Sequence, residues 1–471
     1  MNIVKVVSSI IRSFSTTRMS LRNFRRKSDL KKVNIYRFPQ GLTFYKDYSG
    51  SGLDADYSLG VQKCTFTASR SATNPATYID SNGVIQLVTT SNIPRFDSGY
   101  YDSTGFNTVD INGIRIRGRV VEGAGTNLII RTDGTASGSG LWTGWSSSDA
   151  GLNGTSTKSQ VAIPELTGIV GANAQRIQYT GVGADVDETA ANMFSSTNSG
   201  VATVVSGNVV TLSFYYKAAN VGCNFHVDLV YKDNTGTLIS ASSTSNLSNS
   251  SSWLKITVTG TAPALTDRVN VKIIPTNIDN GDVLDFQFAM PQVEINPYAT
   301  SFIPTTTAAL TRNAEVGKYA ILGNRTAAQE TIVAKFVPFS NFANDGVARR
   351  ILDTETSRLQ FAKTTTGTVV RFDENGSRSA TGTTTLLANT SYVVAGALQS
   401  TGNPNKQNYL NGVSEGTENT DISLTHGTYF FIGSDVASGT HLNGLIQSIA
   451  IFNRALSQSE ITVVTNLLNA Q

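Results

Sequence analysis

Acidic side chains gather in one short stretch of the sequence. Asp279, Asp282 and Asp285 stand three residues apart, with Asn277 and Asn280 beside them, just before a predicted strand. Ca²⁺ takes about six to eight oxygen ligands, so these carboxylates could hold a structural Ca²⁺. Clusters of Asp, Asn and Gly are also common in ordinary turns. We expect no obligatory cofactor, and of the two alternatives the turn is favoured.

A second group of side chains has the chemistry of sugar binding. Aromatic rings cover the apolar faces of sugars, and planar polar groups bind the hydroxyls. Trp142 and Trp145 fall in a Gly/Ser/Thr-rich stretch that we expect to be exposed. Tyr215, His226 and Asp228 lie on the outward-facing register of two predicted strands. The alternative is that these strand residues are merely solvated and that the tryptophans pack against the body.

Catalytic pairs are harder to find. A glycosidase needs two carboxylates across a cleft, and no spacing marks a pair among Glu122, Glu294, Asp353, Glu355, Asp373 and Glu374. The three histidines, His226, His426 and His441, leave little material for a triad or a His-based metal site. Phosphate-loop and zinc-protease motifs do not occur. We therefore expect that the protein is not an enzyme.

The composition indicates which elements position these groups. Of the 471 residues, 39% are hydrophobic and only 15% are charged. A low charge with abundant small polar residues is typical of many short strands joined by turns. It argues against a coiled coil and against strong disorder. No apolar run approaches about eighteen residues, so we expect no membrane insertion. The two cysteines, Cys64 and Cys223, cannot form a disulfide scaffold, and buried free thiols are favoured.

Hydrophobic alternation predicts an all-β fold with two sandwiches. Residues 209–217 and 223–232 alternate between apolar and polar, and further strands follow to residue 290. They predict a jelly roll over residues 165–304. A second sandwich is predicted over residues 305–471, with strands at 331–337, 350–353, 359–362, 368–373, 392–398, 407–409, 429–432 and 444–452. One short helix follows, because Ser457 and Glu460 form a capping box.

Residues 36–131 are also strand-like, with fewer clean strands. Residues 42–48 have the pattern of an opening strand, whereas the second sandwich, beginning near residue 320, lacks one. We hypothesise that residues 40–130 complete the C-terminal sandwich and that the jelly roll is inserted between them. Both ends of the chain would then lie in one domain. Residues 132–164 are predicted to be a loop or linker.

The first 35 residues form a basic arm on a mildly acidic body. Residues 1–34 hold nine Lys and Arg and one acid. The basic residues that we expect to anchor the arm are Arg12, Arg18, Arg22, Arg25, Arg26, Lys27, Lys31 and Lys32. Docking onto a larger assembly is favoured. The alternatives are an organelle transit peptide, whose composition is similar, and a solvated tail. Nucleic-acid binding is disfavoured because only Phe14 and Phe24 offer stacking rings.

Three groups of motifs resemble a multi-domain architecture of tailed-bacteriophage virion proteins. The first includes Thr77-Tyr78-Ile79-Asp80, Pro94-Arg95-Phe96 and Val121-Glu122-Gly123. The second is Ser301-Phe302-Ile303-Pro304 with Thr311-Arg312, and the third covers residues 442–461. The third resembles the closing strand and helix of concanavalin A-like (laminin-G-like) lectin domains, and residues 165–298 resemble carbohydrate-binding-module jelly rolls. The segment between Phe96 and Val121 is longer and more polar than this architecture leads us to expect.

The resemblance implies a structural component of the virion surface: a fibre, spike or capsid-decoration protein. The arm would bind other capsid or tail proteins, and the projecting sandwiches would bind host or mucosal glycans weakly and multivalently. A homo-oligomer, a trimer, is implied by the class. Glu122, as part of a motif, is expected to make a structural hydrogen bond or ion pair. The alternative function is a non-viral secreted glycan-binding protein or a glycosidase accessory module.

Overall fold

The computed structural model describes most of the chain between residues 38 and 470. The segments within that span that are not described are 41, 48–54, 59–66, 70–75, 89–93, 114–115, 131, 133–139, 150–151, 155, 170, 183–191, 197–201, 322–328, 341–348, 355–359, 364–368, 375–377, 401–403, 420–426 and 436–439. The basic residues of the arm, Cys64, His426 and Glu355 lie outside the described residues. In the described part, no helix is both long and apolar enough to cross a membrane.

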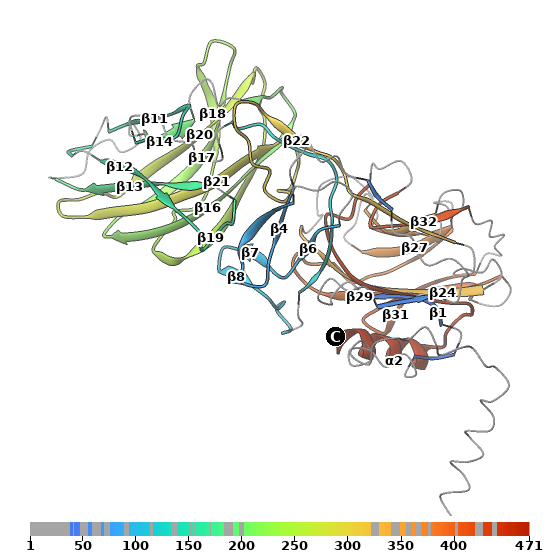
Figure 1. Cartoon of the computed structure of the whole chain (residues 1–471). Coiled ribbons are helices and arrows are strands. Elements are labelled where there is room, and N and C mark those ends of the chain that lie inside the picture. Colours follow the sequence, from blue (N-terminus) through green and yellow to red (C-terminus); the bar gives the residue numbers. More distant parts are fainter. Residues whose placement is uncertain are drawn as a thin grey trace, which may run out of the picture.

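The C-terminal part of the chain forms a β-sandwich (Figure 1). One sheet has the strand order β2-β1-β33-β24-β29-β30-β31, and the other has β28-β27-β26-β25-β32-β23-β3. Of these, β1 (Leu42–Asp47), β2 (Ala55–Ser58) and β3 (Thr67–Ser69) come from the N-terminal region. The strands contributed after the jelly roll are β23 (Val316–Ala320), β24 (Gln329–Pro338), β25 (Arg350–Thr354), β26 (Gln360–Lys363), β27 (Val370–Glu374), β28 (Arg378–Thr381), β29 (Tyr392–Gln399), β30 (Lys406–Leu410), β31 (Val413–Glu418), β32 (Tyr429–Ile432) and β33 (Gly444–Phe452). Between the sheets lies a buried core that includes Ile332, Phe336, Leu352 and Phe430.

The one helix of the described C-terminal part, α2 (Gln458–Asn469), covers the outer face of the first sheet. Its buried residues Ile461, Val464 and Leu468 share a cluster with residues of β24, β29 and β33. The Ser457 side chain accepts a hydrogen bond from the amide of Glu460, and the Glu460 carboxylate accepts one from the amide of Ser457. The predicted capping box is therefore confirmed.

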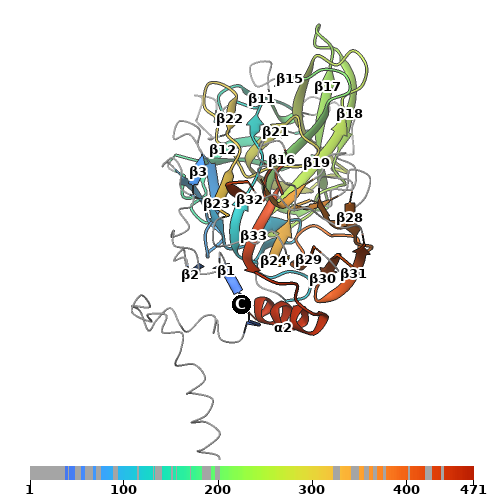
Figure 2. The same ribbon diagram turned by 90° about the vertical axis from the view of Figure 1, so that its right-hand side faces the viewer.

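Strands from the N-terminal region complete this sandwich. β1 (Leu42–Asp47) lies between β33 and β2 (Ala55–Ser58) and pairs antiparallel with both. β3 (Thr67–Ser69) pairs with β23 at the edge of the second sheet, and Figure 2 shows β3, β23 and β32 side by side. β9 (Gly118–Val121) pairs with the beginning of β33. The strand pairs that the sequence analysis expected between residues 40–130 and the C-terminal sandwich are present.

The jelly roll is a second sandwich built from residues between β9 and β23 (Figure 1). One sheet has the order β11-β14-β20-β17-β18, with β15 also on β20, and the other has β12-β13-β21-β16-β19. The bounds are β11 (Trp145–Ser148), β12 (Thr157–Ala162), β13 (Asn173–Thr180), β14 (Asn192–Ser196), β15 (Ala202–Thr203), β16 (Val209–Val221), β17 (Asn224–Lys232), β18 (Leu238–Ser243), β19 (Ser250–Thr261), β20 (Arg268–Thr276) and β21 (Val283–Glu294). The apolar register of β16 and β17 fills the core, as the alternation predicted.

The chain enters and leaves the jelly roll along one short ladder. β10 (Gly125–Asn127) leads into it and β22 (Leu310–Arg312) leads out, and the two pair antiparallel. Asn127 lies opposite Leu310 in this pair. The jelly roll is therefore an insertion between two strands of the other sandwich.

Residues 132–164 are not only a loop or linker, so this prediction is wrong in part. They contain β11 and β12, which form one edge of each jelly-roll sheet. An edge strand such as β12 is partly exposed along its length, so its sequence lacks the alternation by which buried strands are recognised.

A small layer of N-terminal strands lies between the two sandwiches (Figure 1). β4 (Ala76–Ile79) and β5 (Ile85–Val88) form one hairpin, and β7 (Tyr100–Asp102) and β8 (Gly105–Asn107) form another. β6 (Phe96–Asp97) pairs with β9 and ties the layer to the C-terminal sandwich. On the other side, β7 and β8 contact β19 of the jelly roll.

Candidate functional site

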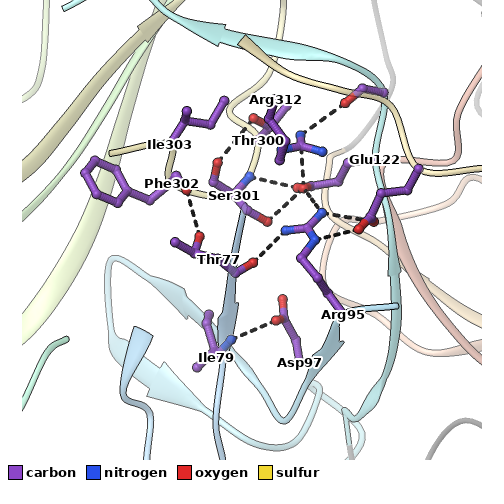
Figure 3. Close-up of polar contacts among 12 residues, drawn as sticks. Thr77, Ile79, Arg95, Asp97, Glu122, Thr300, Ser301, Phe302, Ile303 and Arg312 are labelled. Carbon is purple, nitrogen blue, oxygen red and sulfur yellow. Dashed lines mark hydrogen bonds and ion pairs between the residues drawn. The ribbon is translucent and has the colours of Figure 1, made fainter. Parts of the chain in front are cut away.

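Four oppositely charged side chains are buried together at the junction of the sandwiches (Figure 3). Arg95 donates from Nε to Glu315 Oε1 at 2.7 Å and from Nη2 to Glu315 Oε2 at 3.0 Å. Its Nη2 also donates to Glu122 Oε2 at 2.7 Å. Arg312 Nη2 lies 3.2 Å from the same Glu122 oxygen. Two cations and two anions thus compensate each other where neither sign alone could be buried cheaply.

The same cluster holds the segment by which the chain leaves the jelly roll. The Ser301 amide and hydroxyl donate to the two carboxylate oxygens of Glu122, each at 2.8 Å. Thr77 Oγ1 donates to the Phe302 carbonyl at 2.7 Å, and Arg95 Nη1 donates to the Thr77 carbonyl at 2.6 Å (Figure 3). Glu122 therefore makes the structural hydrogen bonds and ion pairs expected of it.

Burial and charge act in opposite directions on the carboxyl groups here. Burial alone would raise the pKa of Glu122, but the charges of Arg312 and Arg95 and the hydrogen bonds from Arg95 and Ser301 lower it to about 2. Asp97 accepts a hydrogen bond from the Ile79 amide at 2.8 Å. Burial raises the pKa of Asp97 to about 7, although the charge of Arg95 opposes the shift. Two carboxyls of one junction thus differ in protonation near neutral pH.

Replacing Asp97 with asparagine should remove a pH dependence of stability. Between about pH 4 and 7 the folded protein holds the Asp97 proton that the unfolded chain has lost, so stability falls as the pH rises, on the order of 1 kcal/mol per pH unit. Asparagine cannot ionise and can still accept from the Ile79 amide. Urea unfolding at pH 5 and pH 8 measures the effect. A variant that loses as much stability between these pH values as the wild type would contradict the shifted pKa.

A pocket of about 540 Å³ opens beside this cluster, between the N-terminal layer and both sandwiches. Its size falls in the range of about 300–1,000 Å³ of small-molecule sites. The lining includes Asp97 and Tyr101 from the N-terminal layer, Tyr215 and Lys255 from the jelly roll, and Phe339 and Asn389 from the C-terminal sandwich. The rings of Tyr101 and Tyr215 meet edge to face, with centroids 5.3 Å apart. The pocket thus combines aromatic surface with a carboxyl and an ammonium group.

The predicted tryptophan platform lies in the jelly-roll core. Trp142 and Trp145 are 0% and 6% exposed. Their rings meet edge to face at 5.5 Å and pack against Phe288 at 6.1 and 6.0 Å. The expectation that they stand on an exposed linker is wrong, because Trp145 begins β11, Trp142 lies three residues before it, and both enter the sandwich core. The alternative, that they pack against the body, is confirmed.

The remaining predicted sugar-binding residues do not converge. Tyr215 faces away from the jelly-roll core as predicted, but the N-terminal layer covers it and leaves it 4% exposed. His226 and Asp228 lie on β17, in the other sheet, with His226 Nε2 3.4 Å from Asp228 Oδ1. Of the three, Tyr215 alone lines the pocket.

The acidic stretch before β21 forms a turn and an ion pair. The Asp279 amide donates to Asp282 Oδ2 at 3.0 Å, and Gly281 has a φ of 89°. Asp285 lies on β21, where Arg176 pairs with it at 2.6 Å. Among the described residues, no group of three or more His, Cys, Asp or Glu is arranged to hold a metal ion. The three carboxylates do not form such a group, and residues 279–282 form the turn that was the favoured alternative.

Sequence reasoning missed Asp97, Tyr101 and Lys255 as site residues. Asp97 and Tyr101 lie in the polar segment after Phe96 whose length departs from the resembled architecture. That departure was the available signal, since this segment forms β7 and β8 beside the pocket. Lys255 is the cross-strand partner of Tyr215, which the alternation of β16 and β19 could have shown.

Comparison with known proteins identifies the fold of the C-terminal sandwich. Residues 325–462 match the family model of the concanavalin A-like lectin/glucanases superfamily. This sandwich thus has the concanavalin A-like lectin/glucanase fold. A search of curated proteins finds no match.

Among solved structures, the chain is similar to a Trypanosoma rangeli sialidase in complex with the inhibitor DANA, at 12% identity and a TM-score of 0.26 over 32% of this chain and 26% of that chain. Domain 4 of a GH43 extracellular arabinanase from Geobacillus stearothermophilus, in complex with arabinotriose, has 14% identity and a TM-score of 0.26, over 34% and 73% of the two chains. A heptameric SAP-like pentraxin from Limulus polyphemus has 17% identity and a TM-score of 0.23, over 30% and 70%. The chain spans about a quarter of the length of the sialidase.

Proposed function

We propose that the protein is a non-enzymatic carbohydrate-binding attachment protein. The observation that carries this proposal is the match of residues 325–462 to a superfamily of lectins and glucanases. A fold alone does not distinguish binding from catalysis. We therefore consider whether the candidate catalytic carboxylates are engaged in structural contacts. Glu122 is occupied by Arg95, Arg312 and Ser301, and Glu294 accepts two hydrogen bonds from Thr300 at 2.8 Å. Both acids have structural roles, which favours binding.

More specifically, we propose a structural component of a tailed-bacteriophage virion: a fibre, spike or capsid-decoration protein at the virion surface. The support is that Arg95, Glu122, Ser301 and Arg312, from two groups of motifs far apart in the sequence, meet in one buried cluster. These motifs thus build one buried junction between the two sandwiches. The basic residues 1–35 would anchor this body to other virion proteins. A trimer would strengthen weak contacts with host or mucosal glycans by avidity.

A glycan array probed with the full-length protein, with and without Ca²⁺, tests carbohydrate binding. We expect reproducible binding to a coherent set of glycans that EDTA does not abolish, because Asp285 is paired with Arg176 rather than free for an ion. A blank array from folded protein would refute carbohydrate binding. For the virion role, we expect purified particles to contain the protein with residues 1–34 intact. A protein found only free in the medium, or lacking these residues, would refute it.

A further inference from the structure

One wall of the junction pocket is a cross-strand pair on the outer face of the jelly roll. Tyr215 on β16 lies directly opposite Lys255 on β19, so their side chains point to the same side. Both residues line the pocket. The Lys255 ammonium lies 5.9 Å from the centroid of the Tyr215 ring. The jelly roll thus presents a ring and a cation together, and the N-terminal layer closes over them.

The N–H donors of the Lys255 ammonium group are available to a ligand. Within the described part of the chain, no oxygen atom forms a hydrogen bond or ion pair with it, and its contact is the Tyr215 ring. Burial lowers the pKa of Lys255, and the charges of Glu122, Glu294 and Asp97 oppose that shift. An ammonium has three N–H donors, and the half-buried Lys255 presents them to the pocket that it lines. The cavity therefore offers donors that a ligand oxygen would satisfy.

The opposite wall supplies acceptors and a second ring. Asp97 on β6 lines the same pocket, and its Oδ1 already accepts from the Ile79 amide, which fixes the carboxyl in place. The Tyr101 hydroxyl donates to the Gly83 carbonyl at 2.9 Å, so its oxygen remains able to accept. A donor, a carboxyl and aromatic rings in one cavity are the groups that bind the hydroxyls and the apolar face of a sugar ring.

We propose that this pocket binds an uncharged saccharide unit, with Lys255 donating to one hydroxyl and Asp97 accepting from another. The inference rests on the proposed function and places its binding site at the junction rather than on one sandwich. The ligand is uncharged because Lys255 is the cation of the described lining and the carboxyl groups of Asp97 and Asp102 line the pocket with it, whereas Glu122 is already compensated by Arg95 and Arg312. An acidic sugar would bring a further negative charge to these groups.

The test uses the full-length protein and a panel of neutral oligosaccharides, each matched with a form that carries a uronic or sialic acid. Neutral forms should bind at least as tightly as their acidic counterparts. Lys255→Met keeps the aliphatic stem and removes the donors, and it should weaken binding of the neutral ligand about tenfold or more. Lys272→Met is the matched control, since Lys272 lies on β20, in the other sheet of the same sandwich. It should bind as the wild type does.

The outcomes separate this proposal from the proposed function. If the wild type binds sugars and Lys255→Met binds them equally well, the pocket assignment is wrong while carbohydrate binding stands. Weakening by Lys272→Met instead would place the site on the sheet that carries His226 and Asp228. Preference for the acidic forms would overturn the uncharged ligand. If the folded wild type binds no sugar of the panel, both proposals fall. Thermal unfolding of each variant confirms that lost binding is not lost folding.

Discussion

Replacing Arg95 with alanine should lower the free energy of unfolding by about 3–5 kcal/mol. Arg95 is fully buried, and its guanidinium donates to Glu122, to Glu315 and to the Thr77 carbonyl. Arg95 donates two charge-assisted hydrogen bonds to Glu315 and one to Glu122. Without Arg95, both carboxylates lose these bonds at a buried position. Breaking one partner out of a buried ion pair leaves an uncompensated charge, and this is why the loss is large. Chemical denaturation followed by tryptophan fluorescence measures it.

A surface pair provides the control. Arg176 also makes two hydrogen bonds to one carboxylate, at 2.9 and 2.6 Å from Asp285, but its side chain is 35% exposed. Because water can replace the missing partner, Arg176→Ala should cost only about 0–1 kcal/mol. Equal losses from Arg95→Ala and Arg176→Ala would show that burial of the cluster contributes nothing. In that case the junction is not held by its charges.

Local pattern was sufficient to predict most individual strands. β32 and β33 begin and end where the alternation and turn residues placed them. The Asn411-Gly412 hairpin has φ values of 49° and 82°, both positive, as the type I′ turn that an Asn-Gly dipeptide favours requires. Such features depend on residues close in sequence, so the sequence contains them directly. The place of β1 in the C-terminal sandwich is different. That residues 40–130 complete this sandwich was inferred from the absence of an opening strand after residue 320, and the structure pairs β1 with β33.

The sequence was less informative where neighbouring parts of the fold decide burial. Trp142 and Trp145 stand in a polar stretch, yet they fill the jelly-roll core. Tyr215 was placed on the correct face of β16. The sequence of β16 does not indicate that the distant β7–β8 hairpin covers that face. The pocket likewise takes its lining from three parts of the chain. Side-chain direction is a local property, whereas the layer that packs on it is not.

Removing the jelly roll should leave a folded C-terminal sandwich. In the shortened chain, an Asn-Gly dipeptide replaces residues 128–309. Asn127 and Leu310 are opposite each other in the β10–β22 pair, and a two-residue turn of this type joins antiparallel strands across such a gap. The shortened chain loses the bonds from Ser301 to Glu122, so we expect lower stability but a cooperative thermal transition. Circular dichroism measures that transition.

Residues 305–471 alone should fail to fold, although they contain the whole predicted lectin-like domain. They lack β1, which lies between β33 and β2 and contributes Phe44 and Tyr45, each 1% exposed. Loss of one large buried aromatic costs about 3–5 kcal/mol, against a total stability of about 5–15 kcal/mol for a typical domain. Losing both would cost about 6–10 kcal/mol on the same scale, and the hydrogen bonds along β33 would be lost as well, so most of the stability of the sandwich would be gone. A cooperative transition from residues 305–471 alone would show that β1 is dispensable, and a non-cooperative melt of the shortened chain would show that the sandwich depends on its insert.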